Sequence, residues 1–160
     1  MDEKDFLILK ELSKDARVSI KDISKKVGLP RSTVYDRIKK MKESGVIKKF
    51  TVVPDFKKLG KPITAFVLMK CRKSDSMSLE DLGKSIAELP DVCEIHMLSG
   101  DWDFLIKIKS ESIDKIGENV IDRMWKLAGS GLTSTHICFY TVKEDPYDID
   151  HHFFLLDKKI

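Results

Sequence analysis

The stretch IKDISKKVGLPRSTVYDRIKKM, residues 20–41, decides the fold of the first part of the chain. Apolar residues recur at helical spacing on both sides of its glycine, and they are Ile20, Ile23, Val27, Val34, Ile38 and Met41. Ser19 can cap the first helix, Gly28 can end it, and Pro30 suits the first turn of the next. Ser24 stands where many such pairs carry alanine and still permits close approach of the helices. Two short helices joined by a tight turn are typical of a helix-turn-helix.

The outward face of the second helix is polar and basic, as expected of a helix that enters a DNA major groove. We predict that this face contacts base edges and phosphates, and the candidates are Arg31, Ser32, Thr33, Tyr35, Asp36, Arg37, Lys39 and Lys40. The alternative for a basic helix face is an ordinary solvated surface. The turn pattern and the charge of this part of the chain favour DNA contact.

The flanking segments extend the same unit in both directions. Upstream, apolar residues at helical spacing predict a helix over 2–12. Downstream, residues 46–53 alternate enough to predict two short strands, with Lys48 and Lys49 at their tip. Such a pair of strands is a wing, and its two lysines are expected to contact phosphates without reading sequence.

The charge of the chain changes sign near Gly60. Residues 1–60 hold 16 Lys and Arg against 9 Asp and Glu, net +7, whereas residues 61–160 hold 13 against 17, net −4. A basic part joined to an acidic part indicates one module for a polyanion, such as double-stranded DNA, and another for a different partner.

Composition narrows the classes of protein that fit. The chain of 160 residues is 42% hydrophobic and 34% charged, as in folded soluble proteins. It lacks the roughly 18 consecutive apolar residues that span a bilayer and begins without a secretion signal, so we expect a cytoplasmic protein without a membrane partner. Cys71, Cys93 and Cys138 form no C-x-x-C pair and are expected to be buried hydrophobes. No metal or cofactor is predicted.

The second part of the chain alternates strands and helices. Strands are predicted over 63–71, 92–98, 102–109 and 132–142, and helices over 78–89 and 113–127. The order strand, helix, strand, strand, helix, strand predicts a ferredoxin-like sheet with two helices on one face. The expected fold is therefore α+β, with a winged helix-turn-helix domain followed by a ferredoxin-like βαββαβ domain. The expected boundaries are 1–55 for the first domain, 56–61 for a linker, 62–145 for the second domain and 146–160 for a tail.

The open face of the predicted sheet needs a partner. Bulky apolar side chains on both sides of the first and last strands, Phe66, Val67, Leu68, Phe139 and Tyr140, predict sheet-to-sheet packing in a homodimer. The apolar run 153–156 in the tail is expected to pack on a neighbouring subunit, which would extend the dimer to a tetramer or octamer. A dimer would present its two recognition helices to successive major grooves of a pseudo-palindromic site.

The whole pattern resembles the Lrp/AsnC family of feast/famine regulators. The motifs that carry the resemblance are Gly28-Leu29 before the second helix, Gly45-Val46-Ile47 after it, Gly100-Asp101-Trp102-Asp103 between the central strands, and 131–135 at the start of the last strand. The resemblance implies a transcriptional regulator that responds to a small effector, usually an amino acid. It places the effector contacts on Gly100, Asp101, Trp102, Asp103, Thr133, Ser134 and Thr135. Tyrosine or another residue often stands in the family where this chain has Trp102.

Two other functions use the same layout. An architectural protein that coats DNA would show uniform affinity for all sequences and a steep dependence on salt. An enzyme similar to the sirohaem decarboxylases is the second alternative, with His96, His136 and a cluster of Asp148, Asp150, His151 and His152 as its candidate residues. That cluster could also bind a metal. The chain carries no nucleophile motif or phosphate-binding glycine loop, which favours a regulator over an enzyme.

Overall fold

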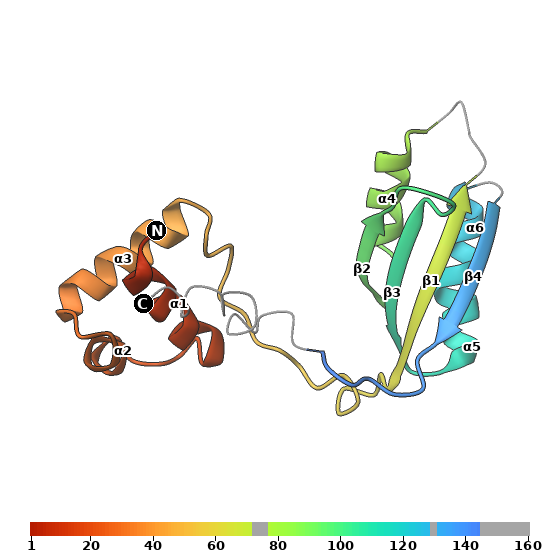
Figure 1. The fold of residues 1–160 in the computed structure, drawn as a ribbon. Coiled ribbons are helices and arrows are strands. Elements are labelled where there is room, and N and C mark those ends of the chain that lie inside the picture. The colour runs from red at the N-terminus through yellow and green to blue at the C-terminus, as the bar shows by residue number, and fades with distance from the viewer. Residues whose placement is uncertain (72–76, 129–130, 145–160) are drawn as a thin grey trace. The chain divides into compact units, whose positions relative to one another are not determined.

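The computed structural model describes residues 1–71, 77–128 and 131–144 (Figure 1). The chain divides into two compact units, one containing Met1–Val53 and the other containing Pro54–Val142. The first unit is helical, and the second is built on a four-stranded antiparallel sheet. This confirms the α+β fold class. The division falls two residues before the expected start of the linker.

Met1–Val53 contains three helices, whose ends lie within a few residues of those that the sequence indicates. They are α1 (Glu3–Lys14), α2 (Ile20–Val27) and α3 (Arg31–Glu43). The side chains of Asp2 and Ser19 accept the backbone N–H of the residue three positions later, at 2.9 and 3.1 Å, and so cap α1 and α2. Gly28 ends α2 in the left-handed conformation with φ +66°. Pro30 is the N-cap of α3 rather than its first residue.

The core of the first unit lies where these helices meet. Ile8, Ile23 and Val34, one from each helix, are completely buried. Other buried residues surround them, namely Leu12, Val27, Met41 and Ile47. A side chain of α1 also binds the last residue of α2, since the Lys4 ammonium donates to the Val27 carbonyl at 2.6 Å.

The two strands expected over 46–53 are wrong, because that segment contains no strand. Ile47 is its buried anchor and donates its backbone N–H to the Met41 carbonyl at 3.0 Å. Phe50, Val52 and Val53 beyond it are exposed. A two-residue hairpin turn favours glycine or asparagine with positive φ, and two lysines at the tip do not supply it. A two-stranded ribbon without a buried face is also marginal in water.

The sheet of the second unit has the order β2-β3-β1-β4. Its strands are β1 (Ile63–Cys71), β2 (Val92–Met97), β3 (Phe104–Ser110) and β4 (Gly131–Ile137). One face is covered by α4 (Leu79–Ala87) and by a second helical segment (Figure 1). That segment consists of α5 (Ile113–Ile116), a π-helical turn η1 (Gly117–Ile121) and α6 (Asp122–Ala128). The ferredoxin-like order is confirmed.

Strand alternation places one side chain in two against the helices. Ala65, Val67 and Met69 of β1 are buried on this face, as are Phe104, Ile106 and Ile108 of β3. Helical residues complete the cluster, and they include Ile86, Ile116, Val120 and Met124. Gly83 lets α4 approach closely, because a Cβ there would lie 3.1 Å from the Phe104 ring.

Close backbone contacts bind β4 to β1 at both ends. At the start of β4, a Cβ on Gly131 would lie 2.4 Å from the Lys70 carbonyl oxygen, so this position requires glycine. At the other end, the Cys138 N–H donates to the Thr64 carbonyl at 2.8 Å. The last strand ends at Ile137, earlier than the expected Val142. Because β1 begins at Ile63 and the two strands are antiparallel, residues after Cys138 run past the start of their partner.

Two expectations about side-chain burial are wrong for this unit. Phe139 and Tyr140 lie beyond β4 and are exposed, so they do not belong to the sheet face. Cys93 is also exposed, and Cys71 and Cys138 are only partly buried. The register of β2 against β3 shifts between Val92 and Glu94, which leaves Cys93 as the extra residue of a bulge.

The expected linker is attached to the sheet unit. Lys61 Nζ lies 2.6 Å from Asp91 Oδ1, and the hydrogen bond from this ion pair raises the pKa of Lys61. The Asp91 carboxylate also accepts the Ser110 hydroxyl at 2.9 Å. Lys109 Nζ lies 5.5 Å from the centroid of the Phe56 ring.

None of the helices in the described residues combines the length and the apolar character that a membrane span requires.

Candidate nucleic-acid interface and effector site

The surface of α3 that points away from the core is polar. Its exposed residues are Arg31, Ser32, Tyr35, Asp36, Lys39 and Lys40, whereas Thr33 is half-buried. This set mixes hydrogen-bond donors and acceptors with positive charge. Such a face can reach both base edges and phosphates. The Lys39 ammonium lies 3.8 Å from the Glu43 carboxylate in an exposed pair, which leaves it accessible to solvent.

Arg37 is less exposed than the residues of this face, and its contact with DNA stays a prediction. Its guanidinium donates to Asp2 Oδ2 at 2.6 Å and to Asp5 Oδ1 at 2.7 Å, which joins α3 to α1. These hydrogen bonds raise the pKa of Arg37, and the bond to Arg37 lowers the pKa of Asp2. Arg37 therefore anchors the recognition helix to the rest of the unit.

Other basic residues widen the candidate surface. Lys48 and Lys49 are exposed in an irregular segment just after the Ile47 anchor, so they stay candidates for phosphate contact. Lys21 and Lys25 of α2, which the sequence pattern did not single out, are also exposed and are further candidates for phosphate contact. Their position next to the recognition helix, on the helix that crosses the backbone in such motifs, was the available signal.

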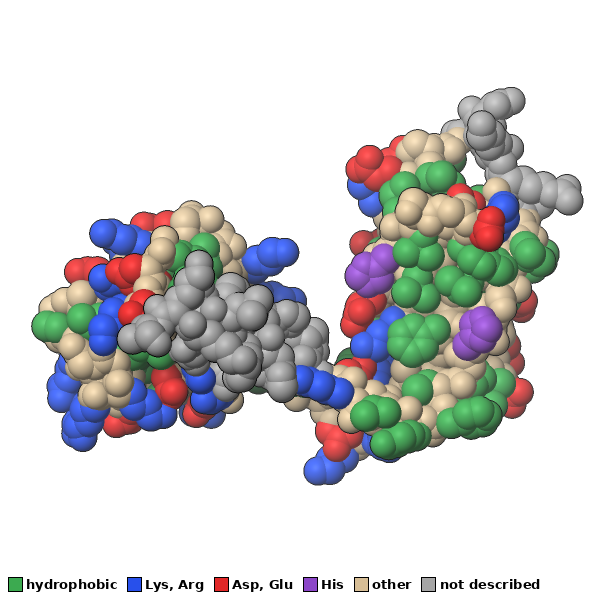
Figure 2. All heavy atoms as spheres, viewed as in Figure 1, with side chains coloured by type: hydrophobic (Ala, Val, Ile, Leu, Met, Phe, Trp, Pro, Cys, Tyr) green, Lys and Arg blue, Asp and Glu red, His purple; other side chains and the backbone are tan. Residues whose placement is uncertain are grey.

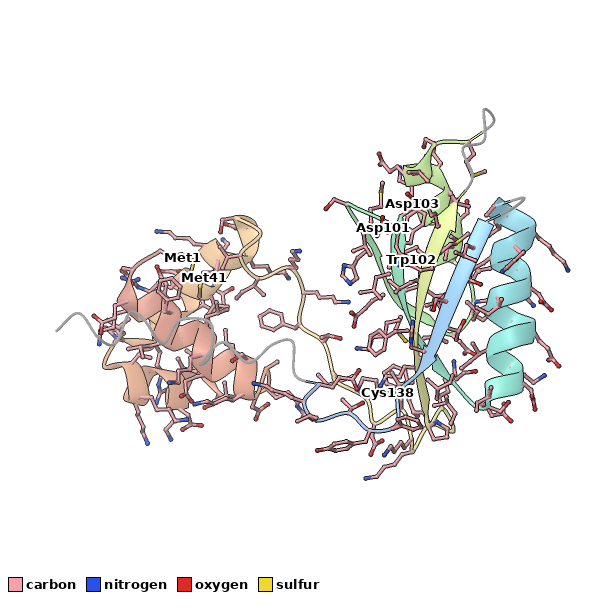
Figure 3. All side chains as sticks on the ribbon, turned by 45° about the vertical axis from the view of Figure 1, so that its right-hand side comes forward. Met1, Met41, Asp101, Trp102, Asp103 and Cys138 are labelled. Atoms are coloured by element: carbon pink, nitrogen blue, oxygen red, sulfur yellow. The ribbon has the colours of Figure 1, made fainter. Side chains whose placement is uncertain are left out.

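The turn between β2 and β3 holds the candidate effector residues Gly100, Asp101, Trp102 and Asp103. Figure 3 labels the last three. Gly100 has φ +114°, a conformation that side chains rarely adopt. The Asp103 N–H donates to the Met69 carbonyl at 2.9 Å, and Asp103 Oδ2 accepts the Cys71 N–H at 2.7 Å. The Asp103 carboxylate thus holds the turn against the end of β1. The exposed Asp101 carboxylate is the better placed of the two acids for a cationic ligand group.

The start of β4 lies at the same end of the sheet. Met69 of β1 pairs with Phe104 on one side and with Thr133 on the other, so the turn and Thr133 flank the same residue of β1. The three candidate hydroxyls do not share a face, however. Thr133 and Thr135 lie on the helix-covered face, because they pair with Met69 and Val67. Ser134 lies on the open face, with its Oγ 3.0 Å from His136 Nε2. Thr133 therefore lies one strand away from the residue that follows the turn, whereas Ser134 lies on the opposite face of the sheet from Thr133.

The open sheet face is apolar in its middle (Figure 2). Register places Phe66 and Leu68 of β1 and Leu105 of β3 on it, and all three are partly buried. Polar groups flank them, since the Lys107 ammonium donates to Glu94 Oε1 at 2.9 Å, and this bond lowers the pKa of Glu94.

Comparison with known proteins covers both units. Residues 1–48 match the family described as winged helix-turn-helix DNA-binding. Residues 64–148 match the Lrp/AsnC ligand binding domain. The chain belongs to the Lrp/AsnC family of transcriptional regulators. This confirms the resemblance seen in the sequence and the fold class that it implied.

Relatives of this Lrp/AsnC protein span nearly its full length. An uncharacterized HTH-type transcriptional regulator of Pyrococcus furiosus is 39% identical over 145 residues, covering 91% of this chain and 97% of the relative. The HTH-type transcriptional regulator FL11 of Pyrococcus horikoshii is 35% identical over 144 residues, covering 90% and 93%. The crystal structure of an AsnC family regulator from Agrobacterium tumefaciens is 28% identical, with a TM-score of 0.84 and coverage of 91% and 95%.

These relatives are transcription regulators, which favours that function over the enzyme considered above. His96 and His136 lie on β2 and β4, the two edges of the sheet, and do not form a site together. The described residues contain no cluster of three or more metal-binding side chains. Asp148, Asp150, His151 and His152, with the rest of the tail, lie outside the described residues.

Proposed function

We propose that this Lrp/AsnC regulator recognises a specific DNA sequence through α3. The observation that carries the proposal is the mixed character of the exposed face, where Asp36 lies among Arg31, Ser32 and Lys40. A protein that only coats DNA gains nothing from a carboxylate that faces phosphates. An aspartate can instead accept a hydrogen bond from cytosine, while arginine recognises guanine. In this proposal, residues 1–55 form the DNA-binding domain, and the protein works in the cytoplasm.

A homodimer would supply the two recognition helices that a pseudo-palindromic operator requires. The apolar middle of the open sheet face, Phe66, Leu68 and Leu105, supports pairing of two copies through this face. Assembly beyond the dimer, through the tail 146–160, is the further step of this proposal.

The second domain, residues 62–145, would bind the effector at the end of β1. An amino acid fits the chemistry of this end of the sheet. The Asp101 carboxylate can pair with an ammonium, and the backbone amides of the glycine turn with the Thr133 hydroxyl can hold a carboxylate. Binding there would change the assembly or the spacing of the two DNA-binding domains.

Selection of bound fragments from random duplex DNA, at about physiological salt, tests the DNA-binding proposal. Enrichment of a pseudo-palindrome with half-sites one helical turn apart is the expected result. Uniform enrichment would instead indicate a coating protein, and failure to retain DNA would contradict both functions.

Titration calorimetry with the twenty amino acids tests the effector proposal. We expect binding by at least one amino acid, and its loss in Asp101→Asn. The matched control is Asp114→Asn, because Asp114 is also exposed but lies on α5. Equal binding by wild type and Asp101→Asn would place the effector elsewhere.

A further inference from the structure

Ser24 is the residue of α2 that contacts the turn leading into α3. Its hydroxyl is partly buried and donates to the Leu29 carbonyl at 2.6 Å. Its own backbone carbonyl accepts the Leu29 N–H at 3.2 Å. Both polar backbone groups of Leu29 are therefore bound by one residue. The second bond belongs to the ordinary helix end at a left-handed glycine, but the first depends on the serine side chain.

The position of Leu29 gives this bond its importance. Leu29 immediately precedes Pro30, which is the N-cap of α3 and makes no side-chain capping bond. Proline also has no backbone N–H. The first turn of α3 therefore begins without the hydrogen bond that a serine or aspartate cap would supply. The Ser24 hydroxyl supplies a directional bond one residue earlier.

The other contacts of α3 described here either hold it farther from its start or are apolar contacts, which do not depend on direction. Ile23 and Val34 pack together in the core, and apolar packing tolerates small rotations of a helix about its axis. The ion pairs of Arg37 with Asp2 and Asp5 hold α3 about 1.7 turns beyond its start at Arg31. Hydrogen bonds lose strength steeply when their angle departs from linearity, so the bond from Ser24 restricts the angle of the first turn.

We propose that Ser24 is a positioning residue for DNA recognition, acting through the direction of the first turn of α3. The first turn of α3 carries Arg31 and Ser32, which are the exposed residues of α3 nearest to its connection with α2. A shift of this turn would move the Arg31 guanidinium off a base edge, where geometry is strict. Phosphate contacts by flexible lysines would hardly change. The proposal rests on sequence-specific recognition by α3 and adds a residue that does not touch DNA.

The test compares Ser24→Ala with the matched control Ser13→Ala. Ser13 lies on α1 and donates its hydroxyl to the Lys10 carbonyl at 2.9 Å, so the control removes a similar bond away from the turn. Alanine favours helix at both sites, so both variants are expected to fold. The measured quantities are the ratio of affinities for the selected operator and for random DNA, and the salt dependence of binding to random DNA.

We expect Ser24→Ala to lower the affinity ratio by roughly threefold to tenfold, the equivalent of one hydrogen bond, with an unchanged salt dependence. Ser13→Ala should keep both quantities. If Ser24 acts through Arg31, Ser24→Ala should lower the ratio no further in an Arg31→Ala background. A wild-type ratio in Ser24→Ala, or full additivity with Arg31→Ala, would overturn the inference. If wild type itself shows no preferred sequence, the proposed function fails instead.

Discussion

Lys61 is ion-paired to Asp91 across 30 residues of sequence, with 2.6 Å between Nζ and Oδ1. Asp91 has φ +72°, which is uncommon for a residue other than glycine. The strained residue thus binds the end of the segment that joins the two units. This contact fixes where the chain enters β1.

Substitutions at Asp91 should separate backbone strain from the ion pair. Asp91→Ala loses the carboxylate and disfavours positive φ, so we expect the second unit to lose about 1–2 kcal/mol from the strain alone. Asp91→Gly loses the same ion pair but accepts the conformation, and should be more stable than the alanine variant. Chemical unfolding measures both. Equal stability of the two variants would contradict a role for the backbone conformation.

Arg37 should contribute to stability rather than to DNA affinity. Arg37→Gln is expected to leave the salt dependence of DNA binding unchanged, whereas Lys40→Gln should reduce its slope by about one. Gel-shift titrations at several salt concentrations measure this difference. An equal reduction of the slope by Arg37→Gln and Lys40→Gln would contradict this prediction. It would mean that Arg37 breaks its ion pairs with Asp2 and Asp5 and contacts a phosphate in the complex.

The same ion pair predicts a pH dependence. The hydrogen bond from Arg37 lowers the pKa of Asp2 in the folded protein below its usual 3.8. The stabilisation is therefore complete above about pH 4 and is lost as the pH falls through the lowered pKa. Thermal unfolding of the first unit between pH 5 and pH 2 should show this loss in wild type and a smaller loss in Arg37→Gln. Equal acid sensitivity in the two proteins would argue against the pair.

Arg31 and Lys48 should differ in what they contribute to recognition. Arg31→Ala is expected to reduce discrimination between operator and random DNA, by about 1–3 kcal/mol if the arginine binds a guanine edge. Lys48→Ala should weaken binding to all sequences similarly and flatten the salt dependence. Parallel titrations of the two variants on both DNAs measure this. Equal loss of specificity from both changes would contradict the division of roles.

Leu68 offers a test of the dimer. Leu68→Glu puts a charge in the apolar middle of the open sheet face and should yield monomers, because the pairing of two copies would bury it. The matched control is Trp125→Glu, an exposed apolar residue on the helical side of the unit. Light scattering gives the mass of each protein. A dimeric Leu68→Glu variant would exclude this face.

Alanine substitutions at Gly131 and Gly117 should have opposite effects on the stability of the second unit. Gly131→Ala should destabilise the second unit by roughly 1–3 kcal/mol, because its Cβ would collide with the Lys70 carbonyl between β4 and β1. Gly117→Ala meets open space at a helical position and should stabilise by about 0.5–1 kcal/mol. Denaturant midpoints measure both changes. A neutral Gly131→Ala variant would show that the two strands can separate at little cost.

Local sequence signals predicted the parts of the fold that local chemistry determines. Ser19 and Gly28 mark the ends of α2 because capping depends on residues within a few positions. β1 is apolar at nearly every position, so its sequence predicted the strand but did not show which side chains face the helices. The two strands expected in the wing were predicted wrongly because strand pairing needs a partner and a suitable turn, and periodicity reports neither.

The candidate site was predicted less completely, because long-range contacts decide it. Periodicity alone cannot show that Arg37 binds Asp2, 35 positions away. Asp101 and Asp103 are the same residue type in the same turn, so the sequence does not distinguish them. In the structure, the Asp103 carboxylate accepts the Cys71 N–H of β1, whereas Asp101 is exposed. The sequence shows Ser24 only as a small side chain, because its hydrogen bond to the Leu29 carbonyl depends on the path of the turn between α2 and α3.

The hydrogen bond from the Cys138 N–H to the Thr64 carbonyl places the entry and the exit of the sheet unit side by side. A domain whose two ends meet in this way can be inserted into a surface loop of another protein with little distortion of its host. The same geometry allows its ends to be joined and new ends to be opened elsewhere. The effector-binding half of this regulator is therefore a natural starting point for a transplantable sensor module.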